Sequence, residues 1–326
     1  MMQKFFSPVV LTVFLLTSIE SVAQNSNVKA PIELPPNFQY PNGIARSSKG
    51  ILYVGSVTSG QILRIDSQGK SEIFFPGSSE IFAANSLRLD EQRDILWGAS
   101  SDFLGIKNSK GETVKRPHRI FAIDTRTGKV LRVIQMPDSG FGNDIALDDK
   151  GGIYLTDSWR PRIHYLAPGT SKLQVWAENP LFNSKQIGLA GIARRPDGVV
   201  IVGMFSTGEL FKITPQPTGV AVEKISLTRK LENPDGMQFA PNGKLLVTEG
   251  SVTSGNGRLL SIDVLSPTNR PRSIETIAAN MESPVNLTIA GNDIWVTESR
   301  VRHRLLPGKE KNVPSRFFVR RFNLKK

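Results

Sequence analysis

The chain of 326 residues contains no cysteine and only three histidines. The absence of cysteine excludes disulfide bonds, a thiol nucleophile and a metal site built from thiolates. We also find no glycine-rich phosphate-binding loop, no serine nucleophile elbow and no paired-histidine zinc motif. Stability must therefore come from packing and from the pairing of strands.

Long apolar runs are absent beyond the N-terminus. Lys4 precedes an apolar stretch over residues 5–19, and Ser21 and Ala23 are the small residues that specify signal cleavage. This pattern predicts a secretory signal over residues 1–23. The alternative is a membrane anchor, but the stretch is shorter than the roughly 20 residues that span a bilayer. We expect a secreted or periplasmic protein with one mature domain, residues 24–326, and no membrane insertion after cleavage.

Acidic residues are scarce relative to basic ones, and the net charge is +12. A basic surface favours anionic partners such as acidic substrates or anionic envelope polymers. We expect a small-molecule substrate that carries negative charge, and no nucleic-acid partner after export. The sequence does not determine the oligomeric state.

One unit of sequence occurs six times, at a spacing of about 40 to 55 residues that is typical of propeller blades. Each copy has an apolar run, a glycine-containing or aspartate-rich corner and a second run rich in β-forming residues, which predicts a hairpin. Further alternating runs supply a third and a fourth strand, and long helical periodicity is absent. The copies are "YPNGIARSSKGILYVGS" from Tyr40, "AANSLRLDEQRDILWGAS" from Ala83, "FGNDIALDDKGGIYLTDS" from Phe141, "GLAGIARRPDGVVIVGM" from Gly188, "NPDGMQFAPNGKLLVTEG" from Asn233 and "SPVNLTIAGNDIWVTES" from Ser283.

Six four-stranded antiparallel units predict an all-β fold, a six-bladed β-propeller. The last copy runs out of chain after the segment "SRFFVRRFNL" from Ser315 and lacks a fourth strand. We expect the segment "APIELP", residues 30–35, to pair with the final blade and close the ring. The alternative is that this segment is a proline-rich linker.

The opening residues of the first strand in each unit face the central channel at one end. Oxygen ligands that converge around an axis suit a hard cation such as Ca²⁺. The alternative is that asparagine and aspartate recur there because they favour turns. The aligned residues are Asn42, Asn85, Asn143, Ala190, Asp235 and approximately Val285.

Two units, "NPDGMQFAPNGKLLVTEG" and "GNDIALDDKGGIYLTDS", resemble blades of the regucalcin/gluconolactonase family and its relatives diisopropyl-fluorophosphatase and paraoxonase. The resemblance implies a six-bladed propeller with a central divalent ion that hydrolyses lactones or organophosphates. It further implies that Asp235 and Asn143 are metal ligands. Asn42 stands where the family has a glutamate, and Ala190 stands where it has an asparagine, so this chain has fewer charged and amide ligands.

Three connections between second and third strands are strongly basic, and they emerge on the same face as the proposed ion. We take Arg116, Arg160 and Arg302, together with Asn85, as candidate substrate-binding residues. The alternative is a solvated rim that binds nothing. The basic residues are Lys107, Lys110, Lys115, Arg116, Arg119, Arg160, Arg162, Arg300, Arg302, Arg304, Lys309, Lys311 and Arg316.

All three histidines, His118, His164 and His303, are expected in these same connections. A histidine can act as a general base beside a bound substrate because its pKa lies near neutral pH. His118 is the first candidate catalytic residue and His303 the second. The alternative for each is a histidine that serves packing.

Two functions follow from these observations. The first is an exported, gluconolactonase-like hydrolase in which Ca²⁺, held by Asp235, Asn143 and Asn42, assists attack of water on a lactone or ester. The second is a non-catalytic propeller that presents its basic face to an anionic ligand or a protein partner. The fold alone does not separate them.

Overall fold

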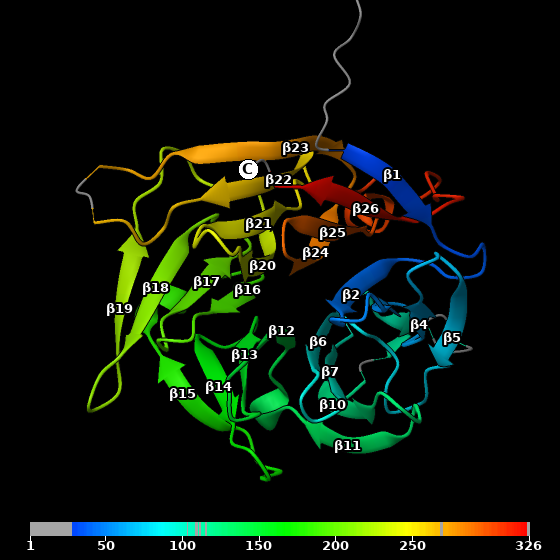
Figure 1. The fold of residues 1–326 in the computed structure, drawn as a ribbon, viewed down its shortest axis with the longest axis horizontal. Coiled ribbons are helices and arrows are strands. Elements are labelled where there is room, and N and C mark those ends of the chain that lie inside the picture. Colours follow the sequence, from blue (N-terminus) through cyan, green and yellow to red (C-terminus); the bar gives the residue numbers. More distant parts are fainter. Residues whose placement is uncertain are drawn as a thin grey trace, which may run out of the picture.

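The computed structural model describes residues 28–102, 104–107, 110, 112–114, 116–267 and 270–324. The predicted signal, residues 1–23, lies outside the described residues. Six four-stranded antiparallel sheets surround a central axis, so the predicted six-bladed propeller is confirmed (Figure 1). No helix among the described residues is long and apolar enough to cross a membrane.

The first three blades follow the chain from the inner strand outwards. Blade 1 contains β2 (Pro41–Arg46), β3 (Leu52–Ser56), β4 (Ile62–Ile65) and β5 (Ser71–Phe75); blade 2 contains β6 (Ser86–Asp90), β7 (Ile95–Ser100), β10 (Arg119–Asp124) and β11 (Val130–Gln135). Blade 3 contains β12 (Gly142–Leu147), β13 (Ile153–Asp157), β14 (Arg162–Leu166) and β15 (Gln174–Glu178).

Blades 4 and 5 repeat this order, and blade 6 does so except that its outer strand comes from the N-terminus. Blade 4 contains β16 (Leu189–Arg194), β17 (Val200–Met204), β18 (Leu210–Pro215) and β19 (Val220–Ile225); blade 5 contains β20 (Pro234–Phe239), β21 (Leu245–Glu249), β22 (Gly257–Ile262) and β23 (Ile274–Met281). Blade 6 contains β24 (Pro284–Ala290), β25 (Asp293–Glu298), β26 (Phe318–Asn323) and β1 (Val28–Glu33).

A few short elements lie in the connections. The two-stranded sheet of β8 (Ile106–Lys107) and β9 (Thr113–Val114) lies between β7 and β10. The helix α1 (Arg302–Leu305) lies between β25 and β26, and two 3₁₀ turns, Pro137–Ser139 and Pro180–Phe182, precede β12 and β16.

The ring is closed by the N-terminal strand, as predicted. β1 pairs antiparallel with β26, with Val28 opposite Phe322 and Glu33 opposite Phe318. The ammonium of Lys29 also forms an ion pair with Asp293 at 2.6 Å. The strand begins and ends two residues before the predicted segment 30–35. It supplies the fourth strand that the sixth copy of the repeat lacks.

The hairpin corners are also as predicted. Gly50, Gly151, Gly198 and Gly243 have φ angles between +81° and +91°, a region that glycine enters without steric cost. Each corner is closed by a hydrogen bond from the glycine N–H to the carbonyl three residues earlier. These corners lie between the first and second strands of each blade. They are at the opposite end of the channel from the aligned residues such as Asn42 and Asp235.

Five of the six aligned residues lie inside strands and not in turns, and the sixth, Asn85, directly precedes β6. Asn42, Asn143 and Asp235 are the second residues of β2, β12 and β20. At each of them the pairing register with the next strand shifts, and the same irregularity occurs in blades 4 and 6. Bulges of this kind re-aim side chains and are frequent beside functional sites. The hypothesis that these residues serve only a turn does not explain their position.

Glycines that directly follow the aligned residues allow the inner strands of neighbouring blades to approach closely. A Cβ atom at Gly191 would lie 1.8 Å from the carbonyl oxygen of Asp235, and one at Gly236 would lie 2.6 Å from the Cα of Asn286. The glycine in these pairs is therefore needed for contact between blades.

Apolar clusters fill the space between neighbouring blades. One cluster packs Trp97 and Ile120 of blade 2 against Ile145 and Leu155 of blade 3. Each fully buried side chain of this size contributes about 1.5–3 kcal/mol of transfer free energy. The clusters fix the blades around the axis and so set the width of the channel.

Candidate functional site

A pocket of about 360 Å³ opens at the end of the channel where the inner strands begin. We call it the first mouth. It is lined by Asn42, Asn85, Asn143, Asp235 and Val285, which are five of the six aligned residues. The expectation that these positions converge at one end of the channel therefore agrees with the structure, whereas Ala190 does not line the pocket.

Asp235 is the one carboxylate among the described residues that line this pocket. Its side chain forms no hydrogen bond or ion pair with any described residue. Burial, and secondarily the negative charge of Asp144, raise the pKa of Asp235 well above its ordinary value. A carboxyl group that faces a cavity without a partner is available to a ligand.

The three aligned asparagines of the pocket differ in which side-chain atoms have no hydrogen-bond partner. The Asn85 Oδ1 accepts a hydrogen bond from the Ser101 N–H at 2.8 Å, so its Nδ2 remains a donor. The Asn143 Nδ2 donates to the Ser158 Oγ at 2.8 Å, so its Oδ1 remains an acceptor. The Asn42 side chain has no hydrogen-bond partner in the part of the chain that the structure describes.

The walls of the first mouth are largely apolar, and no lysine or arginine is among its described lining residues. Trp159 is 48% exposed although it packs against Phe141 and His118, with ring centroids 5.3 and 4.7 Å away. Asp157, which is fully buried, accepts hydrogen bonds from the N–H groups of Phe141 and Trp159 and so positions both rings. The apolar lining residues are Phe141, Trp159, Ile187, Phe205, Val252, Val285, Val301 and Leu305.

The histidines lie behind this wall. His118 is buried, and because a carbonyl only accepts, its Nδ1 must carry the proton that it shares with the Gly140 oxygen at 3.0 Å. His303 is buried on α1 and contacts the Tyr40 hydroxyl at 3.1 Å. Neither histidine is among the residues that line the pocket.

The prediction that all three histidines fall in connections is wrong for His164, which lies within β14. It is fully buried, and its Nε2 lies 3.2 Å from the Asp157 carboxylate. The error arose because the sequence places Arg160 and Arg162 beside it, while β14 begins at Arg162.

The candidate arginines have partners within the protein and do not line the first mouth. Arg116 forms an ion pair with Asp102 at 2.7 Å and lies over the Phe82 ring. Arg160 donates to the Asp138 carbonyl at 2.9 Å. Arg302 donates to two carbonyls of the β21–β22 connection, at 2.6 and 3.0 Å, and thereby holds two lining residues, Val252 and Thr253.

A buried polar network crosses the channel one layer below the first mouth, and the sequence did not indicate it. The Arg88 guanidinium donates to Asp144 at 3.0 Å and to the Asn286 side-chain oxygen at 3.2 Å. Asp144 also accepts from the Ser86 hydroxyl at 2.6 Å and from the Ile192 N–H at 3.2 Å. Ser86, Asp144 and Asn286 occupy the aligned position that is glycine in blades 1, 4 and 5, and this alternation is the signal that could have revealed the network.

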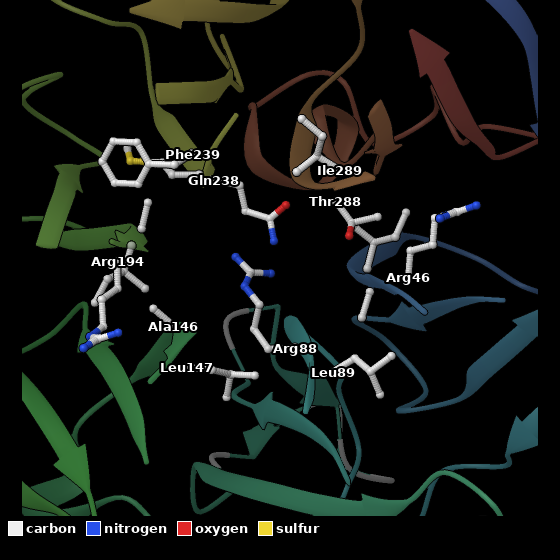
Figure 2. Close-up of a pocket in the computed structure, with 15 residues that line it drawn as sticks. Arg46, Arg88, Leu89, Ala146, Leu147, Arg194, Gln238, Phe239, Thr288 and Ile289 are labelled. Atoms are coloured by element: carbon white, nitrogen blue, oxygen red, sulfur yellow. The ribbon is translucent and has the colours of Figure 1, made fainter. Parts of the chain in front are cut away.

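A second cavity, of about 270 Å³, lies at the opposite end of the channel, and we call it the second mouth (Figure 2). It is lined by the later residues of the inner strands, including Arg46, Arg88, Arg194, Gln238 and Thr288. None of its lining residues lines the first mouth as well, so the two cavities are separate.

The oxygen donors of the first mouth suit a hard cation in kind, since Asp235, Asn143 and Asn42 all have free oxygens. They provide a single negative charge, whereas Ca²⁺ takes 6–8 oxygen ligands with carboxylates among them. No group of three or more His, Cys, Asp or Glu side chains within the described residues could hold a metal. A cation here would be held weakly, with water completing its shell.

No family model and no curated protein matches this chain. Solved structures do. A gluconolactonase of Xanthomonas campestris shares 14% identity, with 93% of each chain covered and a TM-score of 0.63. A streptogramin B lyase shares 18% identity over 84% of this chain and 81% of its own, with a TM-score of 0.60. A protein of unknown function from Bacteroides thetaiotaomicron shares 16% identity over 92% of this chain and 74% of its own, with a TM-score of 0.65.

These identities are low, and the likeness is one of fold. The resemblance that the blade motifs indicated is thus confirmed at that level: the chain has the six-bladed propeller architecture of gluconolactonase-like proteins.

Proposed function

We propose that this protein is an exported hydrolase that opens a lactone or cleaves an ester in the first mouth of its channel. The observation that carries the proposal is the Asp235 carboxyl, which faces a largely apolar pocket beside the three aligned asparagines and has no partner among the described residues. The gluconolactonases among the structures of similar fold support the reaction class. Export rests on the predicted signal over residues 1–23.

The asparagines would divide the work of binding. Asn85, whose oxygen is held by the Ser101 N–H, has its Nδ2 free to donate to the carbonyl oxygen of the substrate. This donor stabilises the negative charge that develops on that oxygen when water attacks. The apolar wall around Phe141 and Trp159 excludes bulk water and strengthens such hydrogen bonds.

Asp235, Asn143 and Asn42 are the residues that would hold a calcium ion, as the family resemblance implies. When bound, a divalent ion polarises a carbonyl as a Lewis acid. Asp235 is also the one titratable side chain among the described residues lining the pocket, and in this proposal its second oxygen takes a proton from the attacking water.

The lining of the pocket suggests what the substrate is. The net charge favoured an anionic substrate, but the candidate arginines are engaged with Asp102 or with backbone carbonyls. We therefore propose that the substrate's reacting part is uncharged and at least partly apolar. Any anionic group would extend past the rim toward the basic connections.

The test uses the mature chain, residues 24–326, and a panel of lactones and aryl esters assayed with calcium and with a chelator. We expect hydrolysis that falls in chelator, together with a melting temperature that rises with added calcium because the ion binds the folded state. Asp235→Asn should lose both effects, and Asp197→Asn, at an exposed hairpin corner, is the matched control. If no substrate is hydrolysed and calcium does not change the melting temperature, the non-catalytic binding propeller is the better interpretation.

A further inference from the structure

The second mouth has the character of a built site. The six residues that lie three positions after the six aligned residues all line it. Three of them are alanines, Ala45, Ala146 and Ala193. The small side chains leave a space around the axis. Figure 2 shows the Arg88 guanidinium and the Gln238 carboxamide pointing toward each other in this space, from opposite sides of the channel.

Hydrogen-bonding groups in this cavity are left without partners. The Gln238 Oε1 is buried and has no hydrogen-bond partner among the described residues, and a buried acceptor of this kind destabilises the fold unless it is satisfied. Arg88 is only 6% exposed, and its hydrogen bonds use both N–H groups of Nη1 and one N–H of Nη2. Its Nε–H and the second Nη2–H remain as donors. Thr288 adds a hydroxyl from blade 6.

The charge around the cavity is positive. Its lining contains three arginines and no carboxylate. Arg88 is neutralised by Asp144, whereas Arg46 and Arg194 form no ion pair with a described residue. Arg46 instead lies over the Trp295 ring at 4.4 Å. The side chains of Arg46 and Arg194 point away from the channel axis in Figure 2. They contribute positive potential at the rim, and Arg88 and Gln238 are the groups that reach the centre.

We propose that the second mouth binds a small hydroxycarboxylate. The carboxylate would accept hydrogen bonds from Arg88 and from the Gln238 amide, under the field of Arg46 and Arg194, and the hydroxyl would donate to the Gln238 Oε1. The aliphatic walls, which include Ile44, Leu89 and Ile192, would surround the carbon chain. The site is separate from the first mouth, so it does not depend on the hydrolysis proposed there.

The test is titration calorimetry of the mature chain with lactate, with acetate, which lacks the hydroxyl, and with lactamide, which lacks the charge. We expect lactate to bind with higher affinity than both, and its affinity to fall as salt screens the arginines. Gln238→Met keeps the volume of the side chain but removes both polar groups, and it should weaken lactate about tenfold, the effect of losing roughly one good hydrogen bond. Asp235→Asn, in the first mouth, should leave lactate binding unchanged.

A second variant keeps the test decisive if Gln238→Met folds poorly. Arg88→Met combined with Asp144→Asn removes the guanidinium without leaving a buried charge, and it should weaken lactate binding by at least tenfold. The proposal is overturned if lactate gives no binding heat, if lactate and acetate bind equally, or if the Asp235 variant loses lactate while the Gln238 variant keeps it.

Discussion

Two layers of the same channel lie one residue apart in every blade. The aspartate of the first layer lacks a hydrogen-bond partner among the described residues, whereas that of the second is bound on several sides. In the first layer, Asp235 and Asn42 face a cavity and have no hydrogen-bond partner among the described residues. In the second layer, Asp144 is bound by a guanidinium, a hydroxyl and two backbone N–H groups. Both layers contain an aspartate, yet only that of the first layer, Asp235, is left without a partner and so free to meet a ligand.

The difference shows that burial with partners is a better guide to role than residue type. Asp144 and Arg88 connect blades 2, 3 and 4, and through Asn286 they reach blade 6. Such a network specifies how the blades are arranged. The unpartnered Asp235 carboxyl in the first layer contributes nothing comparable to the fold, and a ligand explains its position better.

The largest effect on stability should come from breaking the second layer. Arg88→Met leaves the Asp144 carboxylate buried without its counter-ion, and it should lower the free energy of unfolding by about 3–5 kcal/mol. The double variant with Asp144→Asn should recover much of that loss. Urea denaturation monitored by tryptophan fluorescence measures both, and equal stability of the single and double variants would contradict the paired role.

The matching change in the first layer should affect activity and spare the fold. Asp235→Asn removes a charge that has no described partner, so the free energy of unfolding measured in chelator should stay the same or rise. Hydrolysis of the best substrate should fall roughly 100-fold, the effect of losing one preorganised electrostatic group. A destabilisation as large as that of Arg88→Met would place Asp235 among the structural residues.

The spacing between neighbouring blades can be tested at a glycine of the second layer. Gly191→Ala would place a methyl group 1.8 Å from the Asp235 carbonyl oxygen, and the shift needed to accommodate it should cost about 1–3 kcal/mol. Gly243→Asn is the comparison at a hairpin corner, where φ is +81° and a Cβ atom would have no non-neighbouring atom within 4 Å. Because asparagine tolerates this conformation, it should cost less than about 1 kcal/mol. Thermal melts that rank the two variants in the reverse order would contradict the close-approach role.

The smallest effect concerns His118 behind the pocket wall. Burial lowers the pKa of His118, against the opposing influence of its hydrogen bond to Gly140 and of nearby Asp102 and Asp157. The unfolded chain therefore takes up the proton first, so stability present above about pH 6.5 should be lost as the pH falls below that value. His118→Phe should flatten this dependence between pH 5 and 7. If the variant and the wild type lose stability in parallel over that range, His118 does not cause the loss.

The fold could be predicted because each blade repeats the same local signals. The hairpin corners at Gly50 and Gly243 and the missing last strand all lie within short stretches of sequence. The convergence of Asn42, Asn143 and Asp235 followed from the same repeat, since aligned residues on inner strands must meet at one end of the axis.

The partners of those residues could not be predicted in this way. Arg88 reaches Asp144, 56 positions away, and Asn286, 198 positions away, and no local pattern encodes such contacts. From the sequence, the arginines of the basic connections were interpreted as unpaired charges. Their partners, Asp102 for Arg116 and backbone carbonyls for Arg302, depend on loop conformation. The close approach at Gly191 and Gly236 could not be predicted either, because the neighbouring blade that excludes a Cβ atom is remote in sequence.

The pairing of β1 with β26 also has a consequence for how this chain folds. Residues 28–33 complete a sheet whose other strands end at residue 323, so the two ends of the domain must meet before the final blade exists. Contacts of such high sequence separation slow folding, because the entropy of closing a long loop is lost before the pairing is gained. Blades 1 to 5 can each form from contiguous chain, whereas the sixth waits for both ends. We therefore expect refolding in which signals from the first five blades precede a slower phase reported by Trp295 in β25, and in which truncation of β1 removes that phase.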